Sequence, residues 1–392
     1  MPHYYDVGTD RYQLVTSPRG GSARREPDTL HHPDTARALL AAMSDGRSAT
    51  GAAGEVVFHL VEGTELAAES IRPVGVEQSN SSLVVDDRWI LKVFRRVQQG
   101  TNPELEVLRH LAAQGAANVP HLAGWYEVRG EAGPDTLGVL ASLVPDAVDG
   151  WEWLLQQLPE RADETIGPLH RLGAVVAALH RSLAQGEVDD GFGIVPGGPR
   201  LARAIAKGIA ADADRVASSL PPGHESVADA LADAARRAGV IARDLDAGPA
   251  IRVHGDLHLG QTLVGADGWT VIDWEGEPSR SLAERRVHQP ALRDLAGLLR
   301  SLSYAAATAS RATGHWTPEG WVGAARAAVL DGYLAVADDA LLPTGATATS
   351  ELVDLLEIEK LVYEVGYEAA NRPGWLDIPV ADLLRTLGRP AP

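Results

Sequence analysis

Residues 254–278 read HGDLHLGQTLVGADGWTVIDWEGEP, and this stretch concentrates two histidines, five carboxylates and a glutamine beside apolar segments such as PAIRV (249–253) and WTVI (269–272). Burying an unpaired carboxylate costs several kcal/mol, roughly 2–7 for a polar group alone and more for a charge. The acids of this stretch must therefore face water or surround a cation.

The spacing of three residues in this stretch is typical of phosphoryl transfer. Asp256 follows the segment IRVHG, Gln261 comes five residues later, and Asp273 ends the predicted strand WTVI. In kinases a catalytic aspartate, an amide and a metal-binding aspartate follow one another in this order. We therefore expect Asp256 to be the catalytic base, and Gln261 and Asp273 to hold the Mg²⁺ that accompanies ATP.

A lysine on an earlier predicted strand fits the nucleotide phosphates. Lys92 lies in RWILKVFRR, and the segment NPELEVLRHLAAQG that follows has an Asn cap, a Pro at the first position and acids in the first turn, which predicts a helix. We expect Glu106 of this helix to pair with Lys92, with Glu104 as the competing choice.

No glycine-rich phosphate loop is present in the sequence. The segment GVEQSNSSLVV occupies its place, so we expect Ser79, Asn80 and Ser81 to offer hydroxyl and amide groups to phosphate. The adenine-contacting hinge is expected near Ser142 and Val144, through backbone groups, after the predicted strand DTLGVLASLVP.

The chain as a whole divides into three expected regions. Residues 1–75 mix a helix (PDTARALLAAMSDG) with short strands and form an N-terminal cap, and residues 76–145 form a β-rich, nucleotide-binding N-lobe. Residues 146–392 form a mostly helical C-lobe with the catalytic and acceptor site; leucines at helical spacing and a long segment from Glu351 to Arg372, stopped by Pro373, predict helices there. The expected class is α+β and bilobal.

Composition restricts the function classes. The 392 residues carry a formal net charge of -18, so bulk electrostatics does not favour nucleic acid or an anionic membrane as a partner. Cysteine is absent, which excludes disulfides and Cys-ligated zinc. The N-terminus lacks signal-peptide features, and no apolar run approaches ~20 residues. We expect a cytoplasmic protein, a monomer or a homodimer.

With these motifs in place, HGDLHLGQTL…VIDWEGEP resembles bacterial maltokinases, which belong with the aminoglycoside-phosphotransferase-like kinases. LKVFRRVQQGTNPELEV, VPDAVDGWEWLL and EKLVYEVGYEAANRPGWLDIP extend the resemblance from about residue 75 to the C-terminus. It implies a eukaryotic-protein-kinase-like fold with an N-terminal cap, ATP and Mg²⁺ as cofactors, Asp256 as base, and Gln261 and Asp273 as metal ligands.

The resemblance has one departure, which concerns the acceptor. Maltokinases usually carry an Arg-Trp-Phe stretch followed by Gly-Lys near the N-terminus, and residues 1–70 hold no counterpart. A related branch phosphorylates glucosamine, and a cationic amino sugar suits an acidic site. We therefore favour glucosamine, converted to glucosamine 6-phosphate, over maltose, converted to maltose 1-phosphate.

Candidate acceptor-binding residues lie on the last long helix. Glu364 and Glu368 are four residues apart, and Asn371 and Trp375 follow, so carboxylates, an amide and an indole face are available to a sugar ring. The other acceptor candidates, besides Asp256 itself, are His258 and Glu275.

Other interpretations stay open at this point. Glu364 forms an i,i+4 pair with Lys360 and is equally compatible with a plain salt bridge. Trp375 is equally compatible with a core position, and His254 with a structural role in the loop. HGDLH also matches a metal site of a hydrolase. At the level of the whole chain, the alternatives are an aminoglycoside phosphotransferase and a non-catalytic nucleotide-binding protein.

Overall fold

The computed structural model describes residues 2–7, 10–16, 28–51, 54–75, 80–131, 133–314, 316 and 319–389. The chain forms two compact units, of which unit 1 comprises Met1–Ala147 with Ile272–Arg285 and unit 2 comprises Val148–Val271 with Arg286–Pro392. Asp273, the third aspartate of the 254–278 stretch, thus belongs to the unit that carries Lys92, as do Glu275 and Glu277.

Unit 1 is built around a 7-stranded sheet with the order β3-β4-β9-β10-β7-β6-β5 and a 3-stranded sheet with the order β1-β2-β8. Its strands are β1 (Pro2–Val7), β2 (Asp10–Val15), β3 (Ser48–Gly51), β4 (Gly54–Leu60), β5 (Ile71–Pro73), β6 (Asn80–Val85), β7 (Trp89–Phe94), β8 (Arg96–Val97), β9 (Leu122–Gly130) and β10 (Gly133–Ser142). Its helices are α1 (Pro33–Ser44), α2 (Pro103–Ala113) and α7 (Leu282–Arg285).

The helices predicted in unit 1 are confirmed, and the predicted strand that carries Lys92 forms a hairpin with the strand before it. Strands β6 and β7 pair antiparallel up to Val85 opposite Trp89, and Asn102 caps α2 by accepting the amide of Glu104 at 2.8 Å. The expected boundary at residue 75 does not separate two compact units, because β4 pairs with β9 along its length and so joins the first 75 residues to the same sheet.

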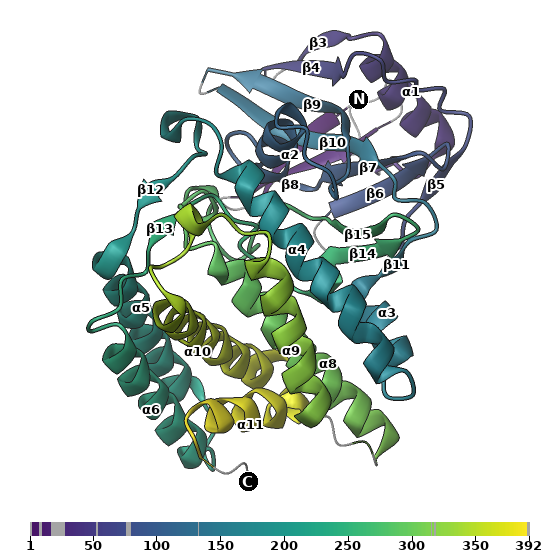
Figure 1. The fold of residues 1–392 in the computed structure, drawn as a ribbon. Coiled ribbons are helices and arrows are strands. Elements are labelled where there is room, and N and C mark those ends of the chain that lie inside the picture. Colours follow the sequence, from purple (N-terminus) through teal and green to yellow (C-terminus); the bar gives the residue numbers. More distant parts are fainter. Residues whose placement is uncertain are drawn as a thin grey trace. The chain divides into compact units, whose positions relative to one another are not determined.

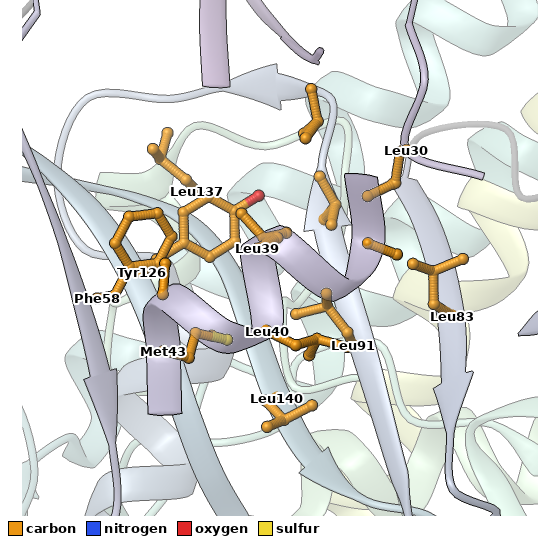
Figure 2. Close-up of a cluster of buried hydrophobic side chains, with 14 of the residues drawn as sticks. Leu30, Leu39, Leu40, Met43, Phe58, Leu83, Leu91, Tyr126, Leu137 and Leu140 are labelled. Atoms are coloured by element: carbon orange, nitrogen blue, oxygen red, sulfur yellow. The ribbon is translucent and has the colours of Figure 1, made fainter. Parts of the chain in front are cut away.

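The core of unit 1 lies between α1 and this sheet. Leu39, Leu40 and Met43 of α1 point toward Leu91 and Tyr126 of the strands (Figure 2), and all five side chains are buried. Fully burying a Leu or Met side chain contributes about 1.5–3 kcal/mol. This packing fixes β7, the strand that carries Lys92.

Unit 2 is mostly helical (Figure 1). Its helices are α3 (Gly150–Gln157), α4 (Ile166–Leu183), α5 (Gly198–Ser219), α6 (Glu225–Ile241), α8 (Leu292–Thr313), α9 (Glu319–Leu334), α10 (Ala346–Asn371) and α11 (Asp377–Thr386). Its strands are β11 (Val148–Asp149), β12 (Val195–Pro196), β13 (Pro249–Ala250), β14 (Thr262–Gly265) and β15 (Gly268–Val271).

Helix α10 contacts α5, α6, α8 and α11 and begins at Ala346, five residues before the predicted start at Glu351. Strands β11, β14 and β15 form a small sheet within the helical unit, and β15 contains most of the predicted strand WTVI. Within the described residues, no helix combines the length and the apolar character needed to cross a membrane.

Candidate active site

A buried aspartate of α8 accepts hydrogen bonds from the backbone of the loop that carries Asp256. Asp294 Oδ2 and Oδ1 accept the amides of His254 and Gly255, each at 2.8 Å. The Asp294 carboxylate also lies 3.0 Å from His180 Nε2, and His180 Nδ1 lies 2.9 Å from the hydroxyl of Tyr333. Asp294 therefore holds the loop directly, and His180 of α4 and Tyr333 of α9 hold Asp294 in place behind it.

Asp294 remains ionised in this environment. Burial opposes its charge, but the hydrogen bond and the charge of His180, together with His254 and the Gly255 amide, outweigh burial and lower the pKa of Asp294. His254 is 3 % exposed and donates its amide to Asp294, which agrees with the structural role considered for it. The loop is thus anchored by a charge-assisted contact.

A glycine of α8 lets the same loop come close to the helix. An ideal Cβ on Gly297 would lie 2.5 Å from the carbonyl oxygen of Leu257, the residue after Asp256. Any larger residue at 297 would therefore displace the loop. Gly297 and Asp256 both line the pocket described next.

Asp256 opens into a pocket of about 610 Å³ whose lining belongs entirely to unit 2. This acceptor pocket, as we name it, is large enough for a small-molecule ligand. Its lining consists of Asp149, Trp151, Glu152, Asp256, His258, Gly260, Gly297, Ser301, Tyr304, Lys360, Tyr363, Glu364, Tyr367, Glu368 and Arg372. Three of the predicted acceptor residues, His258, Glu364 and Glu368, are therefore brought to Asp256.

The carboxylate of Glu364 is held by a buried arginine and not by Lys360. Arg300, which is 3 % exposed, donates to Glu364 at 2.9 Å and to Asp382 at 2.5 Å. Burial opposes the charge of Arg300, but these two carboxylates raise its pKa above the ordinary value. The i,i+4 pair of Lys360 with Glu364 is thus not formed.

Glu368 is the most deeply buried acid of the pocket lining, with 2 % exposure. Its Oε1 accepts the Tyr304 hydroxyl at 2.6 Å and Arg372 at 2.5 Å. Its Oε2 is buried and, among the described residues, has no hydrogen-bond partner. A buried carboxylate oxygen in this condition favours a ligand that donates to it.

Trp375 and Asn371, the predicted acceptor residues at the end of the long helix, do not line the pocket. Trp375 stacks on Tyr304 with ring centroids 6.2 Å apart, so it lies behind a pocket residue and not in the pocket. The amide of Asn371 donates to the Tyr367 carbonyl at 2.9 Å in an exposed position. Trp375 therefore supports a pocket residue from behind, whereas the Asn371 side chain bonds to its own helix.

In unit 1, Lys92 is surrounded by three carboxylates. Its Nζ lies 2.6 Å from Asp273 Oδ1, 2.6 Å from Glu275 Oε1 and 3.0 Å from Glu104 Oε2. Burial lowers the pKa of Lys92, but the three acids outweigh burial and raise it well above its usual value. Lys92 is therefore charged, and the cluster still carries excess negative charge.

The sequence-based choice of Glu106 as the partner of Lys92 was wrong, because the structure pairs Lys92 with the competing Glu104. Side chains two positions apart on a helix point to different faces, so both acids cannot face Lys92. Burial and the nearby Glu275 and Asp273 raise the pKa of Glu104 to about 7, against the opposing charge of Lys92.

Asp273 adopts φ 61°, in the left-handed region that non-glycine residues rarely occupy. Such backbone conformations persist where the surroundings enforce them, and they cluster at functional sites. Here Lys92 holds the side chain. A residue predicted to bind the metal ion therefore has an uncommon backbone conformation.

Glu275 was expected to bind the acceptor, but it lies in the Lys92 cluster of unit 1 and not among the residues that line the acceptor pocket. Asn80 donates to its Oε1 at 2.8 Å and Asn102 to its Oε2 at 3.4 Å. Asn80 and Ser81 are neighbours on β6, so their side chains point to opposite faces of the sheet. Ser81 faces the other side of β6 and accepts from Arg95 at 2.8 Å.

The remaining nucleotide candidates are only partly described. Ser79 lies outside the described residues. The amide of Ser142 donates to the His121 carbonyl at 2.8 Å, and the amide of Leu143 donates to the Arg88 carbonyl at 2.8 Å. These two amides of the expected hinge are thus already used within the protein, whereas Val144 is half-buried at the end of unit 1.

The side chains of unit 1 fit a divalent cation. Carboxylate oxygens of Glu104, Asp273 and Glu275 lie within 4.8 Å of one another, and hard oxygen donors are the ligands that Mg²⁺ prefers. Gln261, the other predicted ligand, ends the short helix η3 (Leu259–Gln261) in unit 2, where His258 caps that helix through the Gly260 amide at 3.1 Å.

Sequence reasoning missed Asp294, Arg300, Tyr304 and the contact of Lys360 with Asp256. The VPDAVDGWEWLL segment, noted only for its resemblance, supplies the pocket residues Asp149, Trp151 and Glu152. The sequence feature that could have indicated this segment is an aspartate at a helix-capping position before a tryptophan-rich helix. In the structure, Asp149 accepts the Trp151 amide at 2.8 Å.

Comparison with known proteins agrees with this arrangement. A family model described as the phosphotransferase enzyme family matches residues 70–339. A glucosamine kinase of Streptacidiphilus jiangxiensis is 26% identical over 389 residues, covering 95% of this chain and 85% of that protein. A glucosamine kinase of Mycolicibacterium smegmatis is 26% identical over 394 residues, covering 96% of each.

Among solved structures, a glucosamine kinase in complex with glucosamine, ADP and inorganic phosphate aligns with a TM-score of 0.76 at 24% identity. The alignment covers 96% of this chain and 88% of that one. A second crystal form of glucosamine kinase aligns with a TM-score of 0.74 at 25% identity, covering 96% of this chain and 85% of that one. The fold is therefore the expected kinase-like fold.

Proposed function

Because the chain belongs to the phosphotransferase enzyme family, we propose that it transfers the γ-phosphoryl group of ATP to a hydroxyl of glucosamine, giving glucosamine 6-phosphate and ADP. The observation that carries this proposal is Glu368, a buried carboxylate in the wall of the acceptor pocket whose Oε2 has no partner among the described residues. An ammonium group on the acceptor would supply the missing donor.

The charge of the acceptor pocket supports a cationic acceptor. Five carboxylates line it against one lysine and one arginine; the acids are Asp149, Glu152, Asp256, Glu364 and Glu368. A neutral disaccharide such as maltose gains little from this excess of negative charge, whereas an amino sugar is attracted by it. The glucosamine kinases that resemble this chain over nearly its whole length support the same acceptor.

In the proposed mechanism Lys92 acts on the nucleotide and Asp256 acts on the acceptor. Lys92, held by Glu104, neutralises phosphate charge of the nucleotide. Mg²⁺ bound with ATP would neutralise further phosphate charge, and Glu104, Asp273 and Glu275 of unit 1 are the residues proposed to hold it.

The acceptor hydroxyl donates its hydrogen bond to Asp256, which orients the oxygen and takes its proton as the new P–O bond forms and the bond from the γ-phosphorus to the ADP oxygen breaks. ADP leaves with that oxygen, and Asp256 returns its proton to water. We place this reaction in the cytoplasm, where ATP is available.

The test is an ADP-release assay with Mg-ATP and five acceptors side by side: glucosamine, N-acetylglucosamine, glucose, maltose and kanamycin. We expect turnover with glucosamine and a large loss with N-acetylglucosamine, because acetylation removes the charge that Glu368 reads. Turnover with maltose and not glucosamine would make the protein a maltokinase, and turnover restricted to kanamycin would make it an antibiotic phosphotransferase.

A further inference from the structure

Lysine is rare in this chain, and two of its lysines contact the two aspartates on which the proposed reaction depends. Lysine occurs only at positions 92, 207 and 360, among 35 Lys and Arg residues. Lys92 contacts Asp273, Lys360 contacts Asp256, and Lys207 is exposed on α5. The chain uses arginine for almost all of its other cations, and these two contacts to aspartate are made by lysines.

Lys360 is directed at Asp256 by its surroundings. Its Nζ lies 3.2 Å from Asp256 Oδ1, and the two side chains are 27% and 18% exposed. The carboxylate four residues further along α10, Glu364, is already held by Arg300 at 2.9 Å. Lys360 thus places a positive charge at the reacting end of an otherwise acidic pocket.

The contact leaves one oxygen of Asp256 for the acceptor. Oδ1 faces Lys360, whereas Oδ2 accepts no hydrogen bond from the residues that the structure describes. A sugar hydroxyl can therefore donate to Oδ2 while Lys360 stays in place. A carboxylate that is shared in this way keeps its role as a hydrogen-bond acceptor but loses much of its attraction for a second cation.

This loss of attraction solves a problem that a cationic acceptor creates. Without Lys360, the Asp256 carboxylate would compete with Glu368 for the acceptor's ammonium group. An acceptor bound with its ammonium at Asp256 holds no hydroxyl in the reacting position, so such binding is unproductive. With Lys360 present, the ammonium is repelled from that end. Glu368 is also held by a cation, Arg372, but it is more deeply buried than Asp256, and its Oε2 has no partner among the described residues, so it remains the stronger site for the ammonium.

Building on the proposed function, we propose that Lys360 determines the orientation of the amino-sugar acceptor by occupying Asp256 and excluding the ammonium group from the reacting position. Lys360 is a specificity-determining residue in this account. Removing its charge should therefore lower turnover without weakening acceptor binding, a combination that loss of simple structural support does not produce.

The experiment compares the wild type with Lys360→Met, Lys360→Arg and the matched control Lys207→Met. Glucosamine affinity is measured by calorimetry, and kcat is measured by ADP release. For Lys360→Met we expect kcat to fall about 100-fold while Kd for glucosamine stays equal or falls. Lys360→Arg should recover most of kcat because it restores the charge, and Lys207→Met should match the wild type.

A rise in Kd that accompanies the fall in kcat would overturn the proposal, because Lys360 would then merely support the pocket. Unchanged kcat in Lys360→Met would overturn it as well. A thermal melt of each variant shows whether the fold is retained, and Lys360→Gln, a polar replacement, takes the place of Lys360→Met if that variant unfolds. The wild type separates the two proposals: its turnover of glucosamine tests the function, and the Kd–kcat pattern tests Lys360.

Discussion

Asp294 and His254 are joined by a charge-assisted hydrogen bond of 2.8 Å from the His254 amide to the buried Asp294 carboxylate. The contact links α8 to the loop that presents Asp256 two residues later. Because the second oxygen of Asp294 holds Gly255 in the same way, one buried side chain sets the course of the loop backbone.

Replacing Asp294 by Asn should destabilise the protein and lower kcat. The variant removes a charge that accepts two amides, so we expect a loss of about 2–3 kcal/mol in the free energy of unfolding. Urea unfolding and the ADP-release assay measure the two effects. Because the pKa of Asp294 is lowered in the fold, the advantage of the wild type should persist above the ordinary Asp value of about 4 and vanish as pH falls through the lowered pKa. A variant as stable as the wild type at pH 7 would contradict this role.

Replacing Gly297 by Ala should reduce turnover through the loop. The new Cβ would lie 2.5 Å from the Leu257 carbonyl oxygen, so the residue beside Asp256 must move. We expect kcat to fall about tenfold or more, since small displacements of reacting groups are costly. Gly239→Ala, at an exposed position of α6 where a Cβ would meet nothing within 4 Å, is the control and should be neutral or stabilising. Equal activity of the two variants would show that the loop tolerates the displacement.

Replacing Glu104 or Glu106 by Gln should show which of the two acids acts as the partner of Lys92. Glu104→Gln removes the partner of Lys92 and should lower kcat/KM for ATP, whereas Glu106→Gln should have little effect. The stability of the ligand-free protein gives a second measure. Because the pKa of Glu104 is raised to about 7, the folded state holds this proton more tightly than the unfolded state.

The wild type should therefore lose stability relative to Glu104→Gln as pH rises from about 5 to about 7, after which the difference should level off. Urea midpoints at pH 5, 6, 7 and 8 record this dependence. A difference that stays constant across this pH range would mean that Glu104 is ionised throughout.

Replacing Glu368 by Gln should raise KM for glucosamine about tenfold or more, because the buried charge that faces the ammonium is lost. KM for ATP should not change. Glu351→Gln, an exposed acid near the start of the same helix, is the matched control. If KM for glucosamine is unaffected, another carboxylate of the pocket reads the amine.

The parts of the fold and site that follow local rules could be predicted from the sequence. Residues close together in the sequence determine the Asn102 cap and the β6–β7 hairpin. They also determine the order of Asp256, Gln261 and Asp273. The kinase-like fold was implied by the family resemblance and is confirmed.

The remainder depends on contacts between distant segments. Lys360 has Glu364 at the spacing that predicts a pair, yet Arg300, which is 64 residues away in sequence, takes that carboxylate. Asp294 looks like an ordinary first-turn acid of a helix, and its partners lie 39 and 40 residues away. Local sequence patterns cannot show which of several charged residues forms an ion pair, because the pairing depends on which side chains are buried together in the fold.

The most direct test of the account is the turnover of glucosamine by Asp256→Asn beside the wild type, at saturating Mg-ATP and glucosamine. Asn keeps the shape of the side chain and removes the proton acceptor. We predict that the wild type phosphorylates glucosamine and that the variant loses at least about 100-fold in kcat with an unchanged melting temperature. Near-normal turnover by a folded Asp256→Asn would contradict the assignment of the base, and with it the site built around Asp256.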